Sequence, residues 1–335
     1  MKLLLNIYLR AFWSLVKKPP APRVLINYFK YYLCRLRPKL KLDFTPTNLV
    51  IYTTKSCNLN CDFCFIGDDL NPENPKKYEL TFEDYSKIKE NKFFKNSLRL
   101  GLLGGEPFIA KDIFLILEDL KKYGKITTVV TNAMLLKGEK LERFKECPPT
   151  ILGLSLYPEN EEDVERVFKE LDSKTIVWIQ TIIEATDLKK IYRVLDYCRK
   201  IGCKNIRMGN YYPTYGNGME HVIFEDNEEY KTIRKEVDSK FGGEFNIDWL
   251  APVQRKVNQK VCLQPLSYIH IDNTGEIGAC FMRSPNKDIY GSIFDQDAWN
   301  NKANQDLRKN MYFKKEGCDP WCRFCENLGE DLYKI

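Results

Sequence analysis

The sequence predicts an α/β fold with a parallel sheet. Six segments, most of them runs of apolar and β-branched residues, are predicted as strands, and segments with helical spacing of apolar residues lie between them. Regular alternation of strands and helices is typical of parallel sheets that are covered by helices. The chain has 335 residues, of which 44% are hydrophobic, so it can bury a full core in one large domain or two smaller ones.

The predicted elements follow one another in a regular order. Strands are predicted at 48–54, 97–103, 126–131, 151–157, 175–183 and 205–210. Helices are predicted at about 81–92, 110–123, 136–146, 160–171 and 187–201. The alternation is then predicted to stop, and residues 216–258 are expected to form an acidic connector with a helix near 226–240. A β-hairpin that turns at 273–275 and a helix near 297–310 complete the expected order.

Composition and charge exclude several classes of protein. Aromatic residues make up 13% of the chain, which excludes disorder. Residues 1–47 carry ten Lys or Arg and one acidic residue, whereas the rest of the chain holds 42 basic and 45 acidic residues. The mildly acidic body argues against a nucleic-acid partner, and the basic N-terminus predicts contact with an anionic surface.

Two basic, aromatic-rich amphipathic helices are predicted within residues 1–45, at 1–16 and 23–37. The polar residues of the second are Arg23, Asn27, Lys30 and Arg37. The first is interrupted by polar residues and has no cleavage site after it, so it is predicted to be neither a signal peptide nor a membrane span. Such helices suit a bilayer interface, and residues 1–40 are the predicted membrane contact. The alternative is that they pack on the protein's own body or on a second subunit.

Three cysteines follow the first predicted strand, in the segment KSCNLNCDFCF. Cys57, Cys61 and Cys64 have the spacing C-x3-C-x2-C, and Phe63 directly precedes the last of them. Three thiolates on a tight loop can bind three irons of a 4Fe–4S cluster and leave the fourth iron open. A structural zinc ion takes four protein ligands, so three cysteines with this spacing fit it poorly.

This cysteine motif resembles the signature of the radical SAM superfamily, and the resemblance extends over most of the chain. It implies that the open iron binds the amino and carboxylate groups of S-adenosylmethionine (SAM). It further implies that a low-potential donor such as ferredoxin or flavodoxin supplies an electron, which cleaves SAM to methionine and a 5′-deoxyadenosyl radical. For residues 46–215 it implies an open, partial (β/α)6 barrel of the TIM type, with its ligands at the C-terminal strand ends.

The ends of the second and third strands carry further motifs that resemble those of the family. Residues Gly104, Gly105, Glu106 and Pro107 are similar to the GGEP motif, in which backbone carbonyls and the glutamate receive the methionine ammonium. An ammonium needs acceptors, and glycines let the backbone come close. Residues Thr131, Asn132 and Ala133 are similar to the family's TNG motif, with alanine where glycine is usual.

Three further residues are implied as SAM contacts by the same resemblance. Ser155, in the fourth strand, stands where the family often contacts the ribose or the carboxylate. Phe63 and the sixth strand, which contains Met208, are implied to line the adenine. Ser155 and Met208 are equally compatible with ordinary packing or surface positions.

A second group of cysteines lies within residues 259–335, at Cys262, Cys280, Cys318, Cys322 and Cys325. It resembles the SPASM or twitch extension of radical SAM enzymes, which binds auxiliary iron–sulfur clusters. The resemblance implies one auxiliary 4Fe–4S cluster with four of these cysteines as ligands, Cys318 being the spare or a replacement. Two 4Fe–4S clusters and SAM are therefore the expected cofactors. Structural zinc is the alternative for this second group, because C-x2-C pairs also suit tetrahedral zinc.

The resemblance predicts hydrogen abstraction from an unactivated C–H bond. The basic helices before the first strand favour a substrate in or on a membrane, so the main prediction is an enzyme that modifies or C–C cross-links hydrocarbon chains of a membrane lipid. The chain is similar in style to archaeal enzymes that cross-link tetraether lipids (H-shaped bridge synthase-like). One alternative is a peptide maturase that forms a thioether, a C–C crosslink or an epimerised residue. Another is a non-catalytic Fe–S or zinc protein that binds membranes as an assembly factor. The expected location is cytoplasmic, peripheral on the inner membrane surface.

Overall fold

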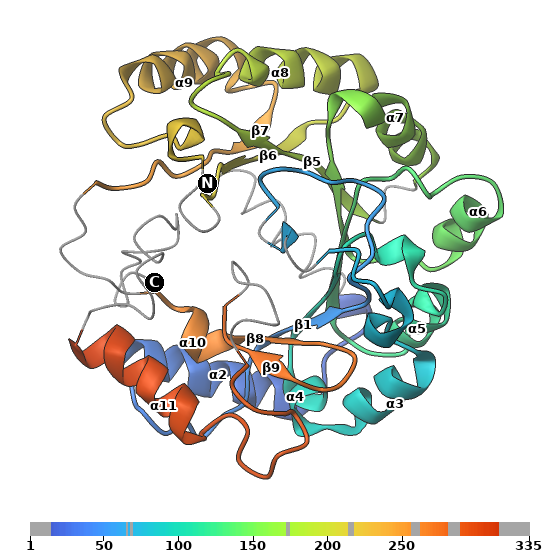
Figure 1. The fold of residues 1–335 in the computed structure, drawn as a ribbon, viewed down its shortest axis with the longest axis vertical. Helices are drawn as coiled ribbons and strands as arrows, with labels where there is room; N and C mark the ends of the chain where they lie inside the picture. Colours follow the sequence, from blue (N-terminus) through green and yellow to red (C-terminus); the bar gives the residue numbers. More distant parts are fainter. Residues whose placement is uncertain are drawn as a thin grey trace.

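The computed structural model describes residues 15–64, 66–67, 70–171, 175–213, 218–255, 262–280 and 289–314. In this part of the chain one nine-stranded sheet has the order β7-β6-β5-β4-β3-β2-β1-β8-β9. It curves around a central space, and helices cover its outer side (Figure 1). Neighbouring strands are parallel except for β8 and β9. The protein is therefore a mixed α/β fold with a mostly parallel sheet that does not close, as the sequence predicts.

Six strands of this sheet match the six predicted ones. They are β1 (Asn48–Tyr52), β2 (Arg99–Leu103), β3 (Ile126–Thr131), β4 (Ile151–Ser155), β5 (Ile176–Ile183) and β6 (Asn205–Asn210). All five residues of β4 are buried. Parallel strands covered on both faces become continuous apolar runs, which makes them recognisable in a sequence.

Helices follow the strands with the expected spacing. They are α3 (Phe82–Glu90), α4 (Lys92–Asn96), α5 (Ile113–Leu120), α6 (Glu139–Glu146), α7 (Glu161–Glu170), α8 (Lys190–Ile201) and α9 (Glu228–Phe241). Thr81 and Asp84 form a capping box that starts α3. Gly202 ends α8 with a φ of 84°, a left-handed conformation that suits glycine. These helices pack on the sheet and leave the C-terminal strand ends to the loops.

Residues 216–258 were predicted as a connector outside the sheet, but part of this region continues the helix–strand alternation. Helix α9 leads into β7 (Asn246–Asp248), which pairs in parallel with β6. This adds one more helix–strand unit to the sheet. The strand was missed because it has only three residues, all partly buried, so it shows neither an apolar run nor an alternating pattern.

The predicted hairpin is present, and its first strand joins the main sheet. β8 (Tyr268–Ile271) pairs in parallel with β1 and antiparallel with β9 (Ile277–Gly278). The short helix α10 (Gln264–Ser267) precedes it, and α11 (Lys302–Arg308) is followed by a π-helical turn at Lys309–Lys314. Arg308 has no exposed side chain and donates hydrogen bonds to the carbonyls of Pro265, Leu40 and Trp299. This one guanidinium therefore connects α11, α10 and the segment before β1.

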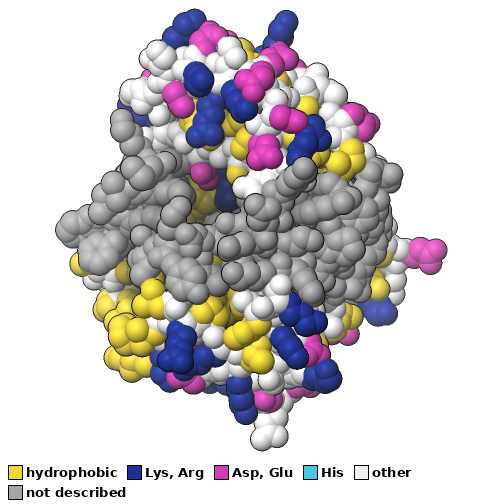
Figure 2. Space-filling model, turned by 90° about the vertical axis from the view of Figure 1, so that its left-hand side faces the viewer, with side chains coloured by type: hydrophobic (Ala, Val, Ile, Leu, Met, Phe, Trp, Pro, Cys, Tyr) yellow, Lys and Arg dark blue, Asp and Glu magenta, His cyan; other side chains and the backbone are white. Residues whose placement is uncertain are grey.

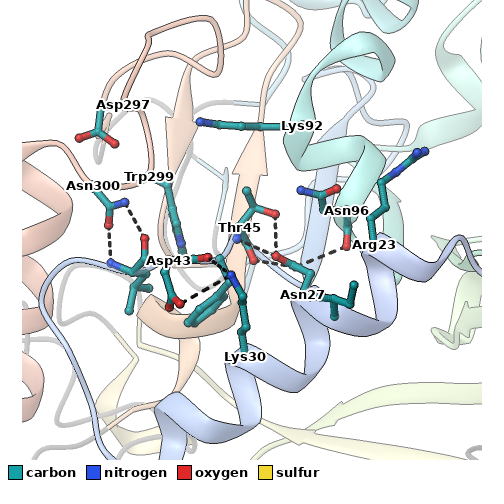
Figure 3. Close-up of a pocket in the computed structure, with 13 residues that line it drawn as sticks. Arg23, Asn27, Lys30, Asp43, Thr45, Lys92, Asn96, Asp297, Trp299 and Asn300 are labelled. Atoms are coloured by element: carbon teal, nitrogen blue, oxygen red, sulfur yellow. Dashed lines mark hydrogen bonds and ion pairs between the residues drawn. The ribbon is translucent and has the colours of Figure 1, made fainter.

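Helix α2 (Pro22–Leu36) matches the predicted second N-terminal helix, whereas the predicted helix at 1–16 lies almost wholly outside the described residues. α2 packs on the body with Val24, Tyr31 and Cys34. Asn27, one of the polar residues predicted for this amphipathic helix, lies on its buried face and is 5% exposed. Its side chain is drawn inward because it accepts a hydrogen bond from the Thr45 amide at 2.8 Å (Figure 3). Within the described residues, no helix is long and apolar enough to cross a membrane.

Candidate cofactor-binding site at the strand ends

A cavity of about 360 Å³ lies at the C-terminal ends of the central strands. Its walls come from the loops after β1, β2 and β3 and from the ends of β4, β5 and β6. Ten of the residues predicted from the sequence line it: Cys57, Cys61, Phe63, Cys64, Gly104, Gly105, Glu106, Thr131, Asn132 and Ser155. This is the edge of a partial barrel at which ligands bind, because the loops there can vary without disturbing the sheet.

The cysteine loop is held by its own backbone. The Cys64 amide donates to the carbonyl of Cys61 at 3.1 Å, and the Cys57 amide donates to Oδ1 of Asn71 at 2.8 Å. All three thiols are half-buried and none is in a disulfide. Burial raises the pKa of Cys57 and Cys61 and raises that of Cys64 to about 11. Without a metal, burial therefore favours the protonated thiols. A bound metal favours the thiolates instead, because metal coordination deprotonates a thiol.

The donor set fits a cluster better than a single ion. Among the described residues, no three His, Cys, Asp or Glu side chains lie close enough together to hold one metal ion. Around a 4Fe–4S cluster each thiolate binds its own iron, so three thiolates spaced along one loop of the cavity wall suit it. Cys57, Cys61 and Cys64 would hold such a cluster, with one iron left for a small ligand.

The two glycines after β2 let this loop pack directly on the cysteine loop. The Gly105 amide donates to the carbonyl of Thr54, and the Glu106 amide donates to that of Ser56, both at 2.8 Å. A Cβ atom on Gly105 would lie 2.1 Å from the Ser56 oxygen, and one on Gly104 would lie 2.4 Å from the Thr54 oxygen. Gly104 also has a φ of 151°, which side-chain-bearing residues rarely adopt. The glycines are thus needed for contact between two backbones.

Gly105→Ala is expected to destabilise the site. The new methyl group would meet backbone atoms that cannot turn away, so we expect a loss of about 1–3 kcal/mol of unfolding free energy, together with a lower iron content after reconstitution. Gly243→Ala is the matched control, because nothing lies within 4 Å of a Cβ atom there. Denaturant unfolding compares the two variants, and equal stability would show that the two loops separate easily.

Glu106 is the buried acid of the site and is only 2% exposed. Its carboxylate accepts hydrogen bonds from Thr131 Oγ1 at 2.7 Å, the Asn132 amide at 2.9 Å and the Phe108 amide at 3.2 Å. Burial nevertheless dominates and raises the pKa of Glu106 to about 7. The carboxylate is therefore aimed and held by its neighbours, and a cation in the cavity would favour its charged form.

The loop after β3 shows why glycine is usual at its third position. Ala133 has a φ of 67°, a left-handed conformation that is uncommon for alanine. The Ala133 amide donates to Thr131 Oγ1 at 3.0 Å, which helps to hold this turn. Asn160, which the sequence did not indicate, donates to the carbonyls of Asn132 and Ser155 at 2.7 and 2.8 Å. It joins the ends of β3 and β4.

Polar and aromatic side chains complete the cavity wall beyond the predicted set. Gln180 on β5 donates to Ser155 Oγ at 3.1 Å and accepts from Trp178 Nε1 at 3.1 Å. Phe63 stacks on Tyr157 with ring centroids 5.9 Å apart. Gln180 was not predicted; a single glutamine within the apolar run TIVWIQTII is the sequence signal that could have indicated it.

Two predicted SAM contacts lie away from the cavity. Met208 is 2% exposed and belongs to the hydrophobic core, whereas its neighbours Arg207 and Gly209 line the cavity. Successive side chains of a strand point to opposite faces, so a one-residue offset decides which of them reaches the ligand. Pro107 is buried at the start of a 3-10 turn and does not line the cavity either.

The second cysteine group is only partly described. Cys262 lies before α10, and Cys280 follows β9, so these two half-buried thiols flank the hairpin. Cys318, Cys322 and Cys325 lie outside the described residues. Cys262 Sγ accepts a hydrogen bond from the Gln264 amide at 3.4 Å.

Three cysteines, a glycine turn and a buried glutamate around one cavity define a candidate cofactor site of a partial barrel. Comparison with known proteins agrees with a cofactor-binding partial barrel. The model of the Radical SAM superfamily matches residues 51–226, more than half of the chain. The chain therefore belongs to the Radical SAM superfamily, a family of enzymes that implies a 4Fe–4S cluster and SAM.

Two individual relatives each share less than a third of their residues with this chain over the matched segments. A probable GTP 3′,8-cyclase of Methanocaldococcus jannaschii is 29% identical over 171 residues, which is 46% of this chain and 56% of that protein. The PqqA peptide cyclase of Granulibacter bethesdensis is 21% identical over 256 residues, 70% of this chain and 67% of that protein. The chain spans about half the length of the first curated relatives, 56% and 50%.

Among solved structures, SuiB of Streptococcus suis bound to SAM has a TM-score of 0.64 at 19% identity. The match covers 88% of this chain and 75% of SuiB. SuiB is also known bound to its precursor peptide SuiA. At this identity the likeness shows the shared fold.

Proposed function

We propose that this chain cleaves SAM reductively and removes hydrogen from an unactivated C–H bond of a peptide. The observation that carries the proposal is the convergence of the cysteine loop, the Gly-Gly-Glu-Pro turn and the Thr-Asn-Ala turn on one cavity. Cys57, Cys61 and Cys64 would hold the 4Fe–4S cluster, and SAM would occupy the cavity beside it. Together these cofactors supply the 5′-deoxyadenosyl radical.

The chain's own residues bind and orient SAM. Glu106 would accept hydrogen bonds from the methionine ammonium, because its carboxylate is buried and held by Thr131 and the Asn132 amide. Ser155, fixed by Gln180, would reach the ribose or the carboxylate. Phe63, stacked on Tyr157, would offer an apolar face to the adenine.

The relatives and the cavity wall favour a peptide over the predicted lipid. The PqqA peptide cyclase acts, by its name, on a peptide, and SuiB binds a precursor peptide. In the wall, half of the Arg207 side chain stays exposed, with Asp248 at 3.6 Å. A hydrocarbon chain there would take water away from the exposed half of this guanidinium and offer it no acceptor, whereas a peptide offers hydrogen-bond acceptors.

The auxiliary cluster is a separate part of the proposal. Cys262 and Cys280, with Cys322 and Cys325, would hold a second 4Fe–4S cluster. The half-buried thiols of Cys262, before α10, and Cys280, after β9, support this. Replacing Cys322 and Cys325 by alanine is expected to lower the iron content from about eight to about four per chain. Unchanged iron would exclude these two cysteines as ligands, and one zinc ion per chain in place of iron would support the zinc alternative.

The proposed function is tested by anaerobic reconstitution followed by dithionite reduction. We expect cluster absorption and 5′-deoxyadenosine, measured by chromatography, and we expect turnover to rise with a small-peptide fraction of the source cells. A total lipid extract is assayed in parallel. If only the lipid extract stimulates turnover, the result would support the predicted lipid substrate instead of a peptide. Complete absence of 5′-deoxyadenosine from a cluster-loaded protein would overturn the assignment and favour the non-catalytic alternative.

A further inference from the structure

The outward face of α2 is an apolar surface on an otherwise polar exterior. Five large apolar side chains of this helix are 47–63% exposed: Leu25, Ile26, Phe29, Leu33 and Leu36. They recur at helical spacing, so they form one continuous stripe. The rest of the described chain, apart from Val16, has four large apolar side chains with comparable exposure, and these are scattered: Leu115, Ile289, Phe294 and Phe313.

The opposite face of the helix fixes α2 to the body. Val24, Tyr31 and Cys34 are at most 8% exposed and pack into the core. Asn27 exchanges hydrogen bonds with the Thr45 backbone at 2.8 and 3.0 Å, and Lys30 lies 3.6 Å from the Asp43 carboxylate (Figure 3). The apolar stripe is therefore presented outward by a helix that the core holds in place.

Polar residues border the apolar stripe on both sides. By helical periodicity, Arg23 and Lys30 lie along one side, and Tyr28 and Tyr32 lie along the other. In Figure 2, which keeps the vertical direction of Figure 1, hydrophobic side chains gather beside Lys and Arg in the lower part of the visible face. Figure 1 places α2, α10 and α11 at this level. Basic side chains and tyrosines suit the headgroup layer of a membrane, and an apolar stripe suits the layer beneath it.

We propose that α2 docks the protein on an anionic lipid surface, with the helix lying in the plane of the interface. Leu25, Phe29 and Leu33 would enter the boundary between headgroups and acyl chains, and the basic side would meet lipid phosphates. The proposal concerns location and is independent of the substrate proposed above. No step of the chemistry depends on it.

Charge decides between a membrane and the other possible occupants. Residues 1–47 carry ten basic residues and one acid. In a two-fold dimer the same face meets itself, so two strongly basic surfaces would be brought together. The segment 1–14 contains Lys2 and Arg10 and no acid, so it offers α2 no compensating charge. An anionic bilayer provides both the apolar layer and the opposite charge.

Vesicle sedimentation of the full-length protein tests the proposal. The probes are vesicles of phosphatidylcholine alone and vesicles with about one third phosphatidylglycerol, at low and high salt. We expect binding to the anionic vesicles only. The double variant Phe29→Ser, Leu33→Ser should reduce the partition coefficient at least tenfold, and Arg23→Gln about fivefold. The double control Leu115→Ser, Phe313→Ser, on exposed apolar residues elsewhere, should bind like the unmodified protein.

Insertion itself is measured with brominated lipids. A tryptophan at position 29 (Phe29→Trp) should be quenched by them, and one at position 115 (Leu115→Trp) should not be, beyond the quenching of the native tryptophans. Circular dichroism and thermal unfolding show that each variant is folded. If a folded Phe29→Ser, Leu33→Ser variant binds vesicles as well as the unmodified protein, the proposal is wrong. A dimer in solution that this double variant converts to a monomer would also overturn it.

Discussion

Replacement of Cys57, Cys61 and Cys64 together by alanine is expected to reduce 5′-deoxyadenosine formation to background. The three thiols line the same cavity as Glu106 and share one loop. Without them no iron can be held beside the predicted SAM position, so reductive cleavage has no electron source there. The iron content should fall by about four per chain, because one cluster is lost. Iron analysis and a chromatographic assay after dithionite reduction measure both effects.

The matched control for this variant is Cys147→Ala. Cys147 is also buried, at 1% exposed, but it lies outside the cavity wall and donates a hydrogen bond to the Arg143 carbonyl at 3.2 Å. Its loss should lower stability slightly and leave iron and 5′-deoxyadenosine unchanged. If the triple variant still formed 5′-deoxyadenosine, the SAM-cleaving cluster would have to lie on the C-terminal cysteines instead.

Glu106→Gln is expected to weaken SAM binding by about 10- to 100-fold at pH 8, which corresponds to the loss of a charge-assisted hydrogen bond. The glutamine keeps the size of the side chain and one acceptor for Thr131. Its amide group would face the Asn132 amide, which now donates to the carboxylate at 2.9 Å. Equilibrium dialysis or calorimetry with SAM measures the effect on the reconstituted protein. Unchanged affinity would remove Glu106 from the ammonium site.

The same residue predicts opposite pH effects on stability and on binding. Burial raises the pKa of Glu106 to about 7, above its usual value of 4.5. Between these values the folded state without SAM holds a proton that the unfolded chain has lost. The contribution of Glu106 to stability is therefore complete below pH 4.5 and is lost as the pH rises through about 7. SAM affinity should change the other way and fall below pH 7, because the ammonium needs the carboxylate. Both dependences should be absent from Glu106→Gln.

Local patterns predicted the central strands and most of the site. The strands β1 to β5 were predicted because each is a short run of apolar and β-branched residues, β6 because it continues the strand–helix alternation, and the helices because their apolar residues recur at helical spacing. The cysteine loop, the glycine turn and the threonine–asparagine turn each consist of adjacent residues at a strand end. Their convergence on one cavity follows from a parallel sheet, whose strands all end at the same edge.

Positions that depend on distant segments could not be predicted in the same way. Met208 was placed in the site, but the strand directs Arg207 and Gly209 there instead. Asn27 was listed with the polar residues of an interfacial helix, but it lies on the buried face, where it is hydrogen-bonded to the Thr45 backbone. Asn160 and Tyr157 support the site from the segment after β4, and no local motif marks them.

The sequence by itself determined the α/β class, the cysteine loop and the family, because adjacent residues carry each of these. Only the tertiary structure decided that β8 lies beside β1, that the two glycines let one backbone pack directly on another, and that burial raises the pKa of Glu106 to about 7. It also decided which face of α2 is exposed. These features arise when segments far apart in the chain meet, and burial and close approach then set their chemistry.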